Sequence, residues 1–189
     1  NSPLRACPGL VTGGLRSLGH GFVRVAAAIP ELRVADCAFN ALKINELIVN
    51  AAAQNVEIIC FPELCITAYT CADLFFQKQL LDDAEKALEK LVKETAELNA
   101  AVVFGRGEIL GVIPKINLPN NNEFYEKRWF ASGKTVSAGY IQLAGQETNF
   151  GTKYYFHTND FTFGIEVCED LWMPVPPSSY LAIQGAEIL

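Results

Sequence analysis

The chain has 189 residues, half of them hydrophobic and 19% charged, which is enough apolar material to bury the core of one domain. Its net charge of −6 and its pI of about 5.0 exclude a general nucleic-acid-binding or anionic-membrane surface, because such surfaces need clustered Lys and Arg. No apolar run approaches the roughly 20 residues that span a bilayer, so we expect neither a membrane nor a nucleic acid as partner.

The six cysteines indicate the redox compartment and argue against a metal site. Cys37, Cys60 and Cys168 fall within apolar helix or strand patterns, where a small buried thiol is commoner than a disulfide. The sequence therefore favours a reducing, cytoplasmic location. Cys60, Cys65 and Cys71 lack the two-residue spacing of a zinc site, and the two histidines lie far from any such pair, so we expect no metal.

The first nineteen residues differ from the rest of the chain. They are rich in glycine, contain no acidic residue and show neither helical nor strand periodicity. Their apolar stretch is short and interrupted by glycine, which disfavours a signal peptide. We expect residues 1–19 to be a flexible leader or an expression remnant outside the fold, and residues 20–189 to form the domain.

From residue 20 onward, strand and helix patterns alternate. We expect a strand at about 21–29, a helix opening at Asp36 as N-cap, and a strand at 56–61. A long amphipathic helix at about 72–99 should follow, and its buried stripe consists of Leu80, Leu81, Ala84, Leu88, Leu91, Val92 and Leu98.

The second half of the chain continues this alternation. Short strands are expected at 101–104 and 108–113, and a hairpin through Asn159 and Asp160 leads into a strand that ends at Cys168. Near-continuous apolar strands among amphipathic helices predict an α/β fold in which helices cover a sheet.

Three apolar segments end on a reactive side chain. Glu63 follows Ile58-Ile59-Cys60-Phe61-Pro62, Lys115 follows the apolar run 109–114, and Cys168 follows the run 161–167. Each has an ordinary explanation when taken alone: an acid at a strand end, a solvated lysine and a buried structural cysteine. Those explanations do not predict a Glu, a Lys and a Cys at the same point of three strand ends, so together the residues predict a catalytic constellation.

The same segments resemble the Glu, Lys and Cys motifs of the nitrilase superfamily of carbon-nitrogen hydrolases. The matching strings are Phe61-Pro62-Glu63, Pro114-Lys115-x-x-Leu118-Pro119-Asn120 with Glu123-Phe124-Tyr125-Glu126, and Gly164-x-x-Val167-Cys168-Glu169-Asp170-Leu171-Trp172. The resemblance covers about residues 20–189 and implies a nitrilase-type α-β-β-α sandwich, incomplete in this chain.

Within the superfamily the resemblance is closest to the glutaminase domain of glutamine-dependent NAD synthetases. It implies glutamine as substrate, a synthetase domain of the same polypeptide as partner, and a homo-oligomer. It implies no cofactor in this domain. ATP and Mg are implied for the synthetase domain, whose Ser-Gly-Gly-x-Asp-Ser loop does not occur in this sequence.

The chemistry of the three residues predicts nucleophilic acyl transfer. A thiol has a pKa near 8.5, so Cys168 needs a base and a nearby cation to react as thiolate, and Glu63 and Lys115 supply them. The backbone N–H of Glu169 and the Lys115 ammonium would stabilise the oxyanion of an attacked amide. We expect the Cys168 thiol, the Glu63 carboxylate and the Lys115 ammonium to converge within about 3 to 5 Å.

Further residues have supporting roles by the same resemblance. Glu126 would hold Lys115 in place, and Glu123 is the alternative if the local register differs by one helical turn. Tyr69 and Tyr125 are candidate contacts of the substrate, although Tyr69 is equally compatible with an ordinary core or surface position.

Three other functions remain to be distinguished from glutamine hydrolysis. A papain-like protease needs a His partner for its Cys, and His157 in the hairpin is better explained as structural. A stand-alone amidase acting on another small amide and a non-catalytic α/β interaction module with a merely buried Cys168 are the alternatives. Thiol alkylation separates the last, because a catalytic Cys168 should react far faster than the other cysteines.

Two features suggest that the domain is incomplete. Glu63 and Lys115 are only 52 positions apart (115 − 63), so we expect a break between Phe104 and Glu108, centred on Arg106, where about 15 to 25 residues are missing. Residues 185–189 have the pattern of an opening strand, so we expect the chain to be a fragment.

Overall fold

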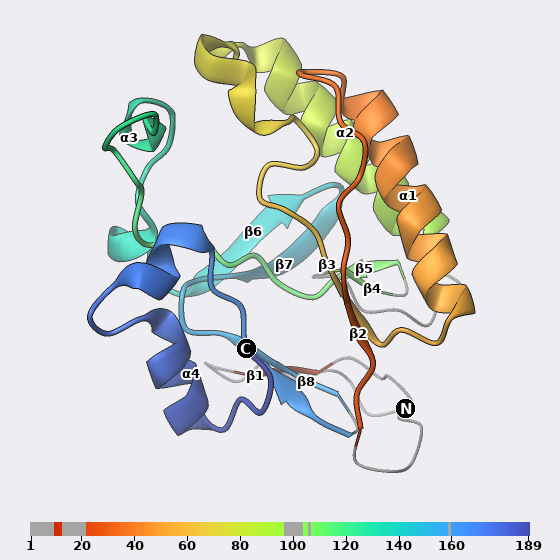
Figure 1. Ribbon diagram of the computed structural model, residues 1–189, viewed down its shortest axis with the longest axis vertical. Coiled ribbons are helices and arrows are strands. Elements are labelled where there is room, and N and C mark those ends of the chain that lie inside the picture. Colours follow the sequence, from red (N-terminus) through yellow and green to blue (C-terminus); the bar gives the residue numbers. More distant parts are fainter. Residues whose placement is uncertain (1–9, 13–21, 97–103, 106, 159) are drawn as a thin grey trace. The chain divides into compact units, whose positions relative to one another are not determined.

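A computed structural model describes residues 10–12, 22–96, 104–105, 107–158 and 160–189 (Figure 1). These residues form two compact units. The N-terminal unit takes in 22–109 and 142–146, and the C-terminal unit takes in 10–12, 110–141 and 147–189. Glu63 and Tyr69 therefore belong to the N-terminal unit, whereas Lys115 and Cys168 belong to the C-terminal unit.

The N-terminal unit contains a pair of parallel strands. Strand β2 (Val25–Ala27) pairs with β3 (Ile58–Cys60), with Val25 opposite Ile58. The Ala28 N–H extends the pairing by donating to the Cys60 carbonyl at 2.8 Å. Both strands lie where the apolar runs predict them but are shorter. Cys60 is exposed rather than buried, because it ends a strand of a two-stranded sheet.

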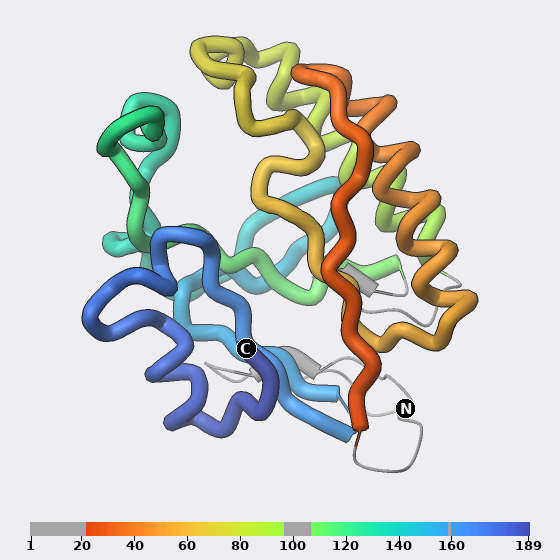
Figure 2. Tube along the Cα trace, in the orientation of Figure 1, coloured from red at the N-terminus to blue at the C-terminus, as the bar shows by residue number. Residues whose placement is uncertain are grey.

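Helix α1 (Cys37–Ala53) begins where the sequence predicts. The Asp36 side chain accepts a hydrogen bond from the Phe39 N–H at 3.0 Å, which confirms the N-cap. Ala41, Ile44 and Ile48 are buried on one face of the helix. This face packs beside helix α2, and the two helices run side by side in Figures 1 and 2.

The long helix expected at 72–99 is shorter than predicted. A 3₁₀ segment, η1 (Tyr69–Phe76), comes first, and Ala72 within it has φ 49. Helix α2 (Lys78–Glu94) begins after the extended residue Gln77. The helical periodicity of apolar side chains holds only from Leu80 onward.

The buried stripe of α2 agrees only in part with the expected one. Leu80, Leu91 and Val92 are buried as predicted. Ala84 and Leu88 are only half-buried, and Leu81 is 53% exposed. Ala87, one turn before Leu91, is buried although the prediction did not include it. Leu98, the last residue of the predicted stripe, lies outside the described residues.

Two short strands complete the N-terminal unit. Strand β4 (Phe104–Gly105) pairs antiparallel with β5 (Glu108–Ile109), and Gly107 between them has φ 78. The expected strand residues 101–103 and the break expected at Arg106 lie outside the described residues. Strand β5 ends at Ile109 rather than at 113.

The chain contains a hairpin that the sequence analysis does not anticipate. Strands β6 (Gly139–Leu143) and β7 (Gln146–Phe150) are joined by a two-residue turn. Ala144 and Gly145 in that turn have φ 48 and 76, the positive values that a tight hairpin turn requires. In the N-terminal unit, the Ala144 N–H donates to the Glu85 carboxylate at 3.0 Å.

The C-terminal unit is built on a three-stranded sheet of β1 (Leu10–Thr12), β8 (Tyr155–His157) and β9 (Thr162–Phe163). Strand β8 pairs antiparallel with β9, as the predicted hairpin requires, although Asn159 itself lies outside the described residues. Strand β1 pairs parallel with β8. At these three positions the expectation that residues 1–19 lie outside the fold is wrong, because a strand so short carries no periodicity in its sequence.

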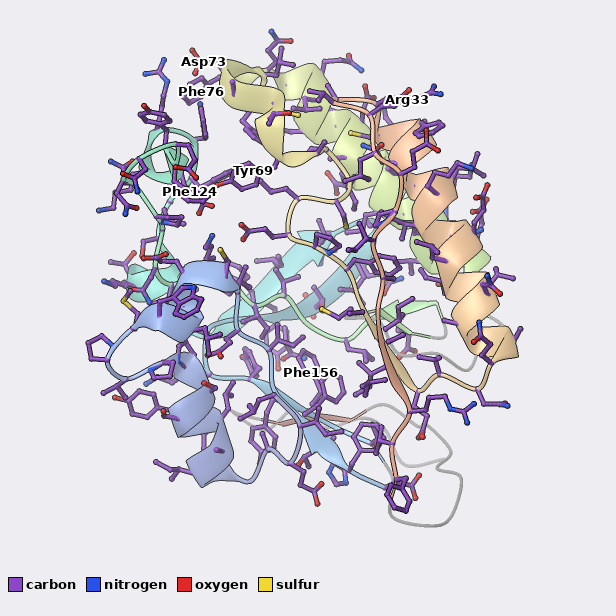
Figure 3. The ribbon with its side chains drawn as sticks, in the orientation of Figure 1. Arg33, Tyr69, Asp73, Phe76, Phe124 and Phe156 are labelled. Carbon is purple, nitrogen blue, oxygen red and sulfur yellow. The ribbon has the colours of Figure 1, made fainter. Side chains whose placement is uncertain are left out.

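Aromatic rings fill the core of this unit. Phe156, which is labelled in Figure 3, is 1% exposed. Its ring stacks on Phe163 with centroids 5.0 Å apart. Gly111 lies against the same ring, and a side-chain carbon there would come within 3.3 Å of Phe156. Tight packing of this core positions the segment that leads to Lys115.

The last elements of the chain close the C-terminal unit. Helix α4 (Pro177–Gln184) starts with proline in its first turn and ends at Gly185 with φ 107, a combination that favours these boundaries. The Glu166 carboxylate accepts from the Ser178 N–H at 3.0 Å. Ile188 forms an isolated parallel bridge with Phe163, and no strand is formed by the described residues 185–189 beyond this bridge.

None of the helices in the described residues has the length and apolar character that a membrane span requires.

Candidate active site

The backbone of Lys115 is held from both sides within the C-terminal unit. Before it, the Val112 N–H donates to the Asn149 carbonyl at 2.8 Å. At the residue itself, the Lys115 carbonyl accepts from the N–H of Gly133, which opens the 3₁₀ turn η2 (Gly133–Thr135), also at 2.8 Å. A side chain at position 133 would meet the Pro114 carbonyl at 2.9 Å, so this close approach requires glycine.

The Lys115 ammonium binds Glu126, the first residue of the short helix α3 (Glu126–Trp129). Nζ lies 2.9 Å from Oε1 and 2.7 Å from Oε2. The two side chains are 13% and 3% exposed, respectively. Because water is largely excluded, each charge depends on the other, and the ammonium has a fixed position.

The neighbouring candidates lie at the surface. Glu123, the alternative partner of Lys115, is exposed, so of the two acids it is Glu126 that makes the contact. Tyr125 is 56% exposed and precedes α3 as its N-cap residue. Its contact with substrate stays a prediction.

Cys168 lies at a sharp turn. The extended segment after β9 runs to Val167, and the 3₁₀ turn η3 (Cys168–Trp172) begins at the cysteine itself. Cys168 has φ 51, a left-handed conformation that costs a non-glycine residue about 1–2 kcal/mol. Its side chain is exposed and carries a thiol. Strained backbone conformations of this kind cluster at active sites, where a sharp turn can expose the side chain of a nucleophile.

Both oxygens of the Asp170 carboxylate, two residues after Cys168, accept hydrogen bonds. Oδ2 accepts from the Ile116 N–H at 3.2 Å, and Oδ1 accepts from the N–H and the side-chain amide of Asn117 at 2.7 and 2.8 Å. Asp170 is 2% exposed. The residues directly after Lys115 are thus tied to the turn that contains Cys168.

Glu63 lies in the N-terminal unit, three residues after β3. It is half-buried, and the loop around it is conformationally demanding, since Leu64 has φ 56 and Ala68 has φ 65. Tyr69, labelled in Figure 3, is half-buried and opens η1. The two units are described separately, so the convergence of Glu63 with Lys115 and Cys168 stays a prediction.

Two contacts within the C-terminal unit therefore join the motifs. Lys115 is paired with Glu126, and Asp170 of the Cys168 turn is bonded to Asn117 in the loop after Lys115. Glu169 follows Cys168 in η3 and is half-buried. Sequence reasoning gave no role to Asp170. The available signal is that Asp170 is the second of two acids directly after the expected nucleophile. Among the described residues, no group of three or more His, Cys, Asp or Glu is arranged to hold a metal ion.

The carbon-nitrogen hydrolase family model matches residues 24–189. The chain belongs to the carbon-nitrogen hydrolase family. The match contains all three predicted catalytic positions, and the nitrilase-type α/β fold expected from the motifs is confirmed.

Similar proteins indicate which branch of the carbon-nitrogen hydrolase family this chain resembles. The chain is 37% identical to a glutamine-dependent NAD(+) synthetase of Mycobacterium tuberculosis over 90% of this chain and 28% of the relative. A crystal structure of such a synthetase from Cytophaga hutchinsonii has 26% identity and a TM-score of 0.69, and the match covers 78% of this chain and 28% of that one. An amidase from Nesterenkonia sp. shares the fold at 18% identity and a TM-score of 0.58, covering 88% of this chain and 63% of that one. The chain thus spans little more than a quarter of the curated relative.

The alignment with this relative does not locate any gap, so the break expected between Phe104 and Glu108 stays a prediction.

Proposed function

We propose that this domain hydrolyses the side-chain amide of glutamine and supplies the ammonia to a synthetase domain of the same polypeptide, which amidates nicotinic acid adenine dinucleotide to NAD with ATP. The observation that carries the proposal is the buried Lys115–Glu126 pair, tied through the following loop to the strained turn of Cys168. The identity of 37% to a glutamine-dependent NAD(+) synthetase supports glutamine over another small amide.

The reaction begins with the thiol of Cys168. Glu63 accepts the thiol proton, and the thiolate attacks the amide carbon of glutamine to form a carbon–sulfur bond. The Lys115 ammonium and the Glu169 N–H stabilise the negative oxygen. The carbon–nitrogen bond then breaks, and Glu63 returns the proton to the leaving nitrogen, which departs as ammonia.

The second half-reaction restores the enzyme. Glu63 takes a proton from water, and the resulting hydroxide attacks the thioester carbonyl. Glutamate leaves as the carbon–sulfur bond breaks, and the proton returns to the sulfur. The Glu126 carboxylate holds the Lys115 ammonium in one position throughout both steps.

The test uses the full-length polypeptide that contains this domain. Cys168→Ala should abolish ammonia release from glutamine but leave NAD synthesis from added ammonia largely unchanged, because only the ammonia source is lost. Cys65→Ala is the matched control and should retain both activities. Equal loss of both activities in Cys168→Ala would show that Cys168 is structural. Hydrolysis of short aliphatic amides in preference to glutamine would favour the stand-alone amidase instead.

A further inference from the structure

We propose that Asp170 is a positioning residue that sets the separation between the Lys115 ammonium and the Cys168 thiol. The proposal rests on the proposed function and deepens it. The Asp170 carboxylate is 2% exposed and accepts three hydrogen bonds, all from residues 116 and 117. One side chain thus joins the two segments that carry the cation and the nucleophile.

Only short stretches of backbone separate the Asp170 hydrogen bonds from the two reacting residues. Ile116 and Asn117 directly follow Lys115, and Asp170 lies two residues after Cys168. Consecutive Cα atoms are 3.8 Å apart, so neither stretch leaves much freedom between the hydrogen-bonded groups and the reacting residues. A shift of the Asp170 carboxylate is therefore transmitted to the position of Cys168 relative to Lys115.

Lys115 has anchors that do not depend on Asp170. Its carbonyl is bonded to Gly133 and its ammonium to Glu126. The Cys168 turn is bonded within itself, because the Asp170 N–H donates to the Val167 carbonyl at 3.1 Å and the Met173 N–H donates to the Asp170 carbonyl at 3.4 Å. The Asp170 carboxylate ties this strained turn to the residues that follow Lys115. Loss of the Asp170 carboxylate should therefore displace the nucleophile while the cation keeps its place.

Asp170→Asn tests this in the full-length polypeptide. The amide oxygen can keep the bond from the Asn117 N–H, but the amide nitrogen then faces the Ile116 N–H donor. We expect kcat for glutamine hydrolysis to fall about 100-fold, the effect of a misplacement of about 1 Å, with KM for glutamine nearly unchanged. NAD synthesis from added ammonia should stay at the wild-type rate, which reports that the synthetase domain remains folded, whereas the unchanged KM for glutamine reports that this domain does.

Glu187→Gln is the matched control. The Glu187 carboxylate also accepts from a backbone N–H, that of Thr162 at 2.7 Å, and from the Thr162 hydroxyl at 3.2 Å, but it is exposed and its bonds are to β9. It should leave kcat and KM unchanged. A drop in kcat equal to that of Asp170→Asn would show that any lost carboxylate of this unit slows the reaction, and would overturn the proposal.

Exchange of the side chains at positions 117 and 170 tests the positioning role of Asp170 even if Asp170→Asn folds poorly. Asn117→Asp alone places two carboxylates against each other and should lower kcat, whereas the double variant Asn117→Asp, Asp170→Asn restores the side-chain hydrogen bond with its donor and acceptor exchanged. We expect kcat of the double variant to exceed that of Asn117→Asp at least 10-fold. No recovery of kcat, or a kcat within about threefold of wild type in folded Asp170→Asn, would overturn the proposal. The outcome of Cys168→Ala does not depend on the Asp170 and Asn117 variants. Glutamine hydrolysis by Cys168 and the positioning role of Asp170 are therefore tested separately.

Discussion

Charged side chains are used in opposite ways by helix α2 of the N-terminal unit and by the Lys115 region of the C-terminal unit. Along α2, ion pairs such as Lys78–Asp82 and Lys93–Glu89 connect successive helical turns, and their side chains are 40% to 84% exposed. In the Lys115–Glu126 pair the exposures are 13% and 3%. Exposed pairs contribute a few tenths of a kcal/mol to helix stability, whereas a buried pair must overcome the cost of dehydrating both charges.

The comparison indicates which charges have a function. Replacing a buried ion pair by apolar side chains is often neutral or stabilising, so the fold does not require Lys115 and Glu126 to be charged. A cation held at one position next to the Cys168 turn is useful for chemistry. The ion pairs of α2 keep one face of the helix solvated.

The largest stability effect is expected from breaking the buried pair. Lys115→Met should lower the free energy of unfolding by about 3–5 kcal/mol, because the Glu126 carboxylate stays buried without its partner. Lys78→Met, the exposed counterpart, should change it by less than about 0.5 kcal/mol. Urea denaturation of the full-length polypeptide measures both.

The same pair gives a test that separates stability from activity. Adding Glu126→Gln to Lys115→Met removes the unpaired charge and should restore part of the lost stability, while glutamine hydrolysis stays abolished. Equal stability of Lys115→Met and Lys78→Met would contradict the distinction between the two regions.

The second prediction concerns cysteine reactivity at different pH values. Burial raises the pKa of Cys65 from 9.0 to about 11, so at pH 8 its thiolate fraction is about 100-fold below that of an ordinary thiol. We expect iodoacetamide to modify Cys168 first and Cys65 slowly, with the Cys65 rate still rising between pH 9 and 11. Peptide mapping after timed alkylation measures both. Faster modification of Cys65 than of Cys168 at pH 8 would argue against a reactive Cys168.

The raised pKa of Cys65 also has a consequence for stability. Above pH 9 the unfolded chain loses this proton, whereas the folded domain keeps it until about pH 11. Stability should therefore decline across that interval, and the decline should be smaller in Cys65→Ala.

The smallest effect is expected at the backbone of Cys168. Its φ of 51 favours glycine, so Cys168→Gly should be more stable than Cys168→Ala by about 0.5–1 kcal/mol. Both variants should be inactive toward glutamine, and differential scanning calorimetry compares their stabilities. A more stable alanine variant would mean that the turn is not left-handed.

The sequence predicts local features of this fold better than long-range ones. The N-cap Asp36 is readable because its partner lies three residues away, and the resemblance alone suggested Glu126 as the partner of Lys115. The break between η1 and α2 was missed, because the extended conformation of Gln77 leaves no mark in the hydrophobic pattern. Strand β1 depends entirely on distant β8.

Asp170 was missed for a related reason. Two of its three donors are backbone N–H groups, which every non-proline residue has, so the residues at 116 and 117 do not reveal the contact. The roles of Glu63, Tyr69 and Tyr125 stay predictions, since they concern contacts with a substrate or between the two units.

The most direct test of the central claim is to find the intermediate on Cys168. The full-length polypeptide is mixed with glutamine, quenched with acid during turnover, digested and analysed by mass spectrometry. We predict a glutamyl group on the peptide that contains Cys168, absent in Cys168→Ala and absent when glutamate replaces glutamine. Active hydrolysis with an unmodified Cys168 peptide, or a glutamyl group on another cysteine, would contradict the account.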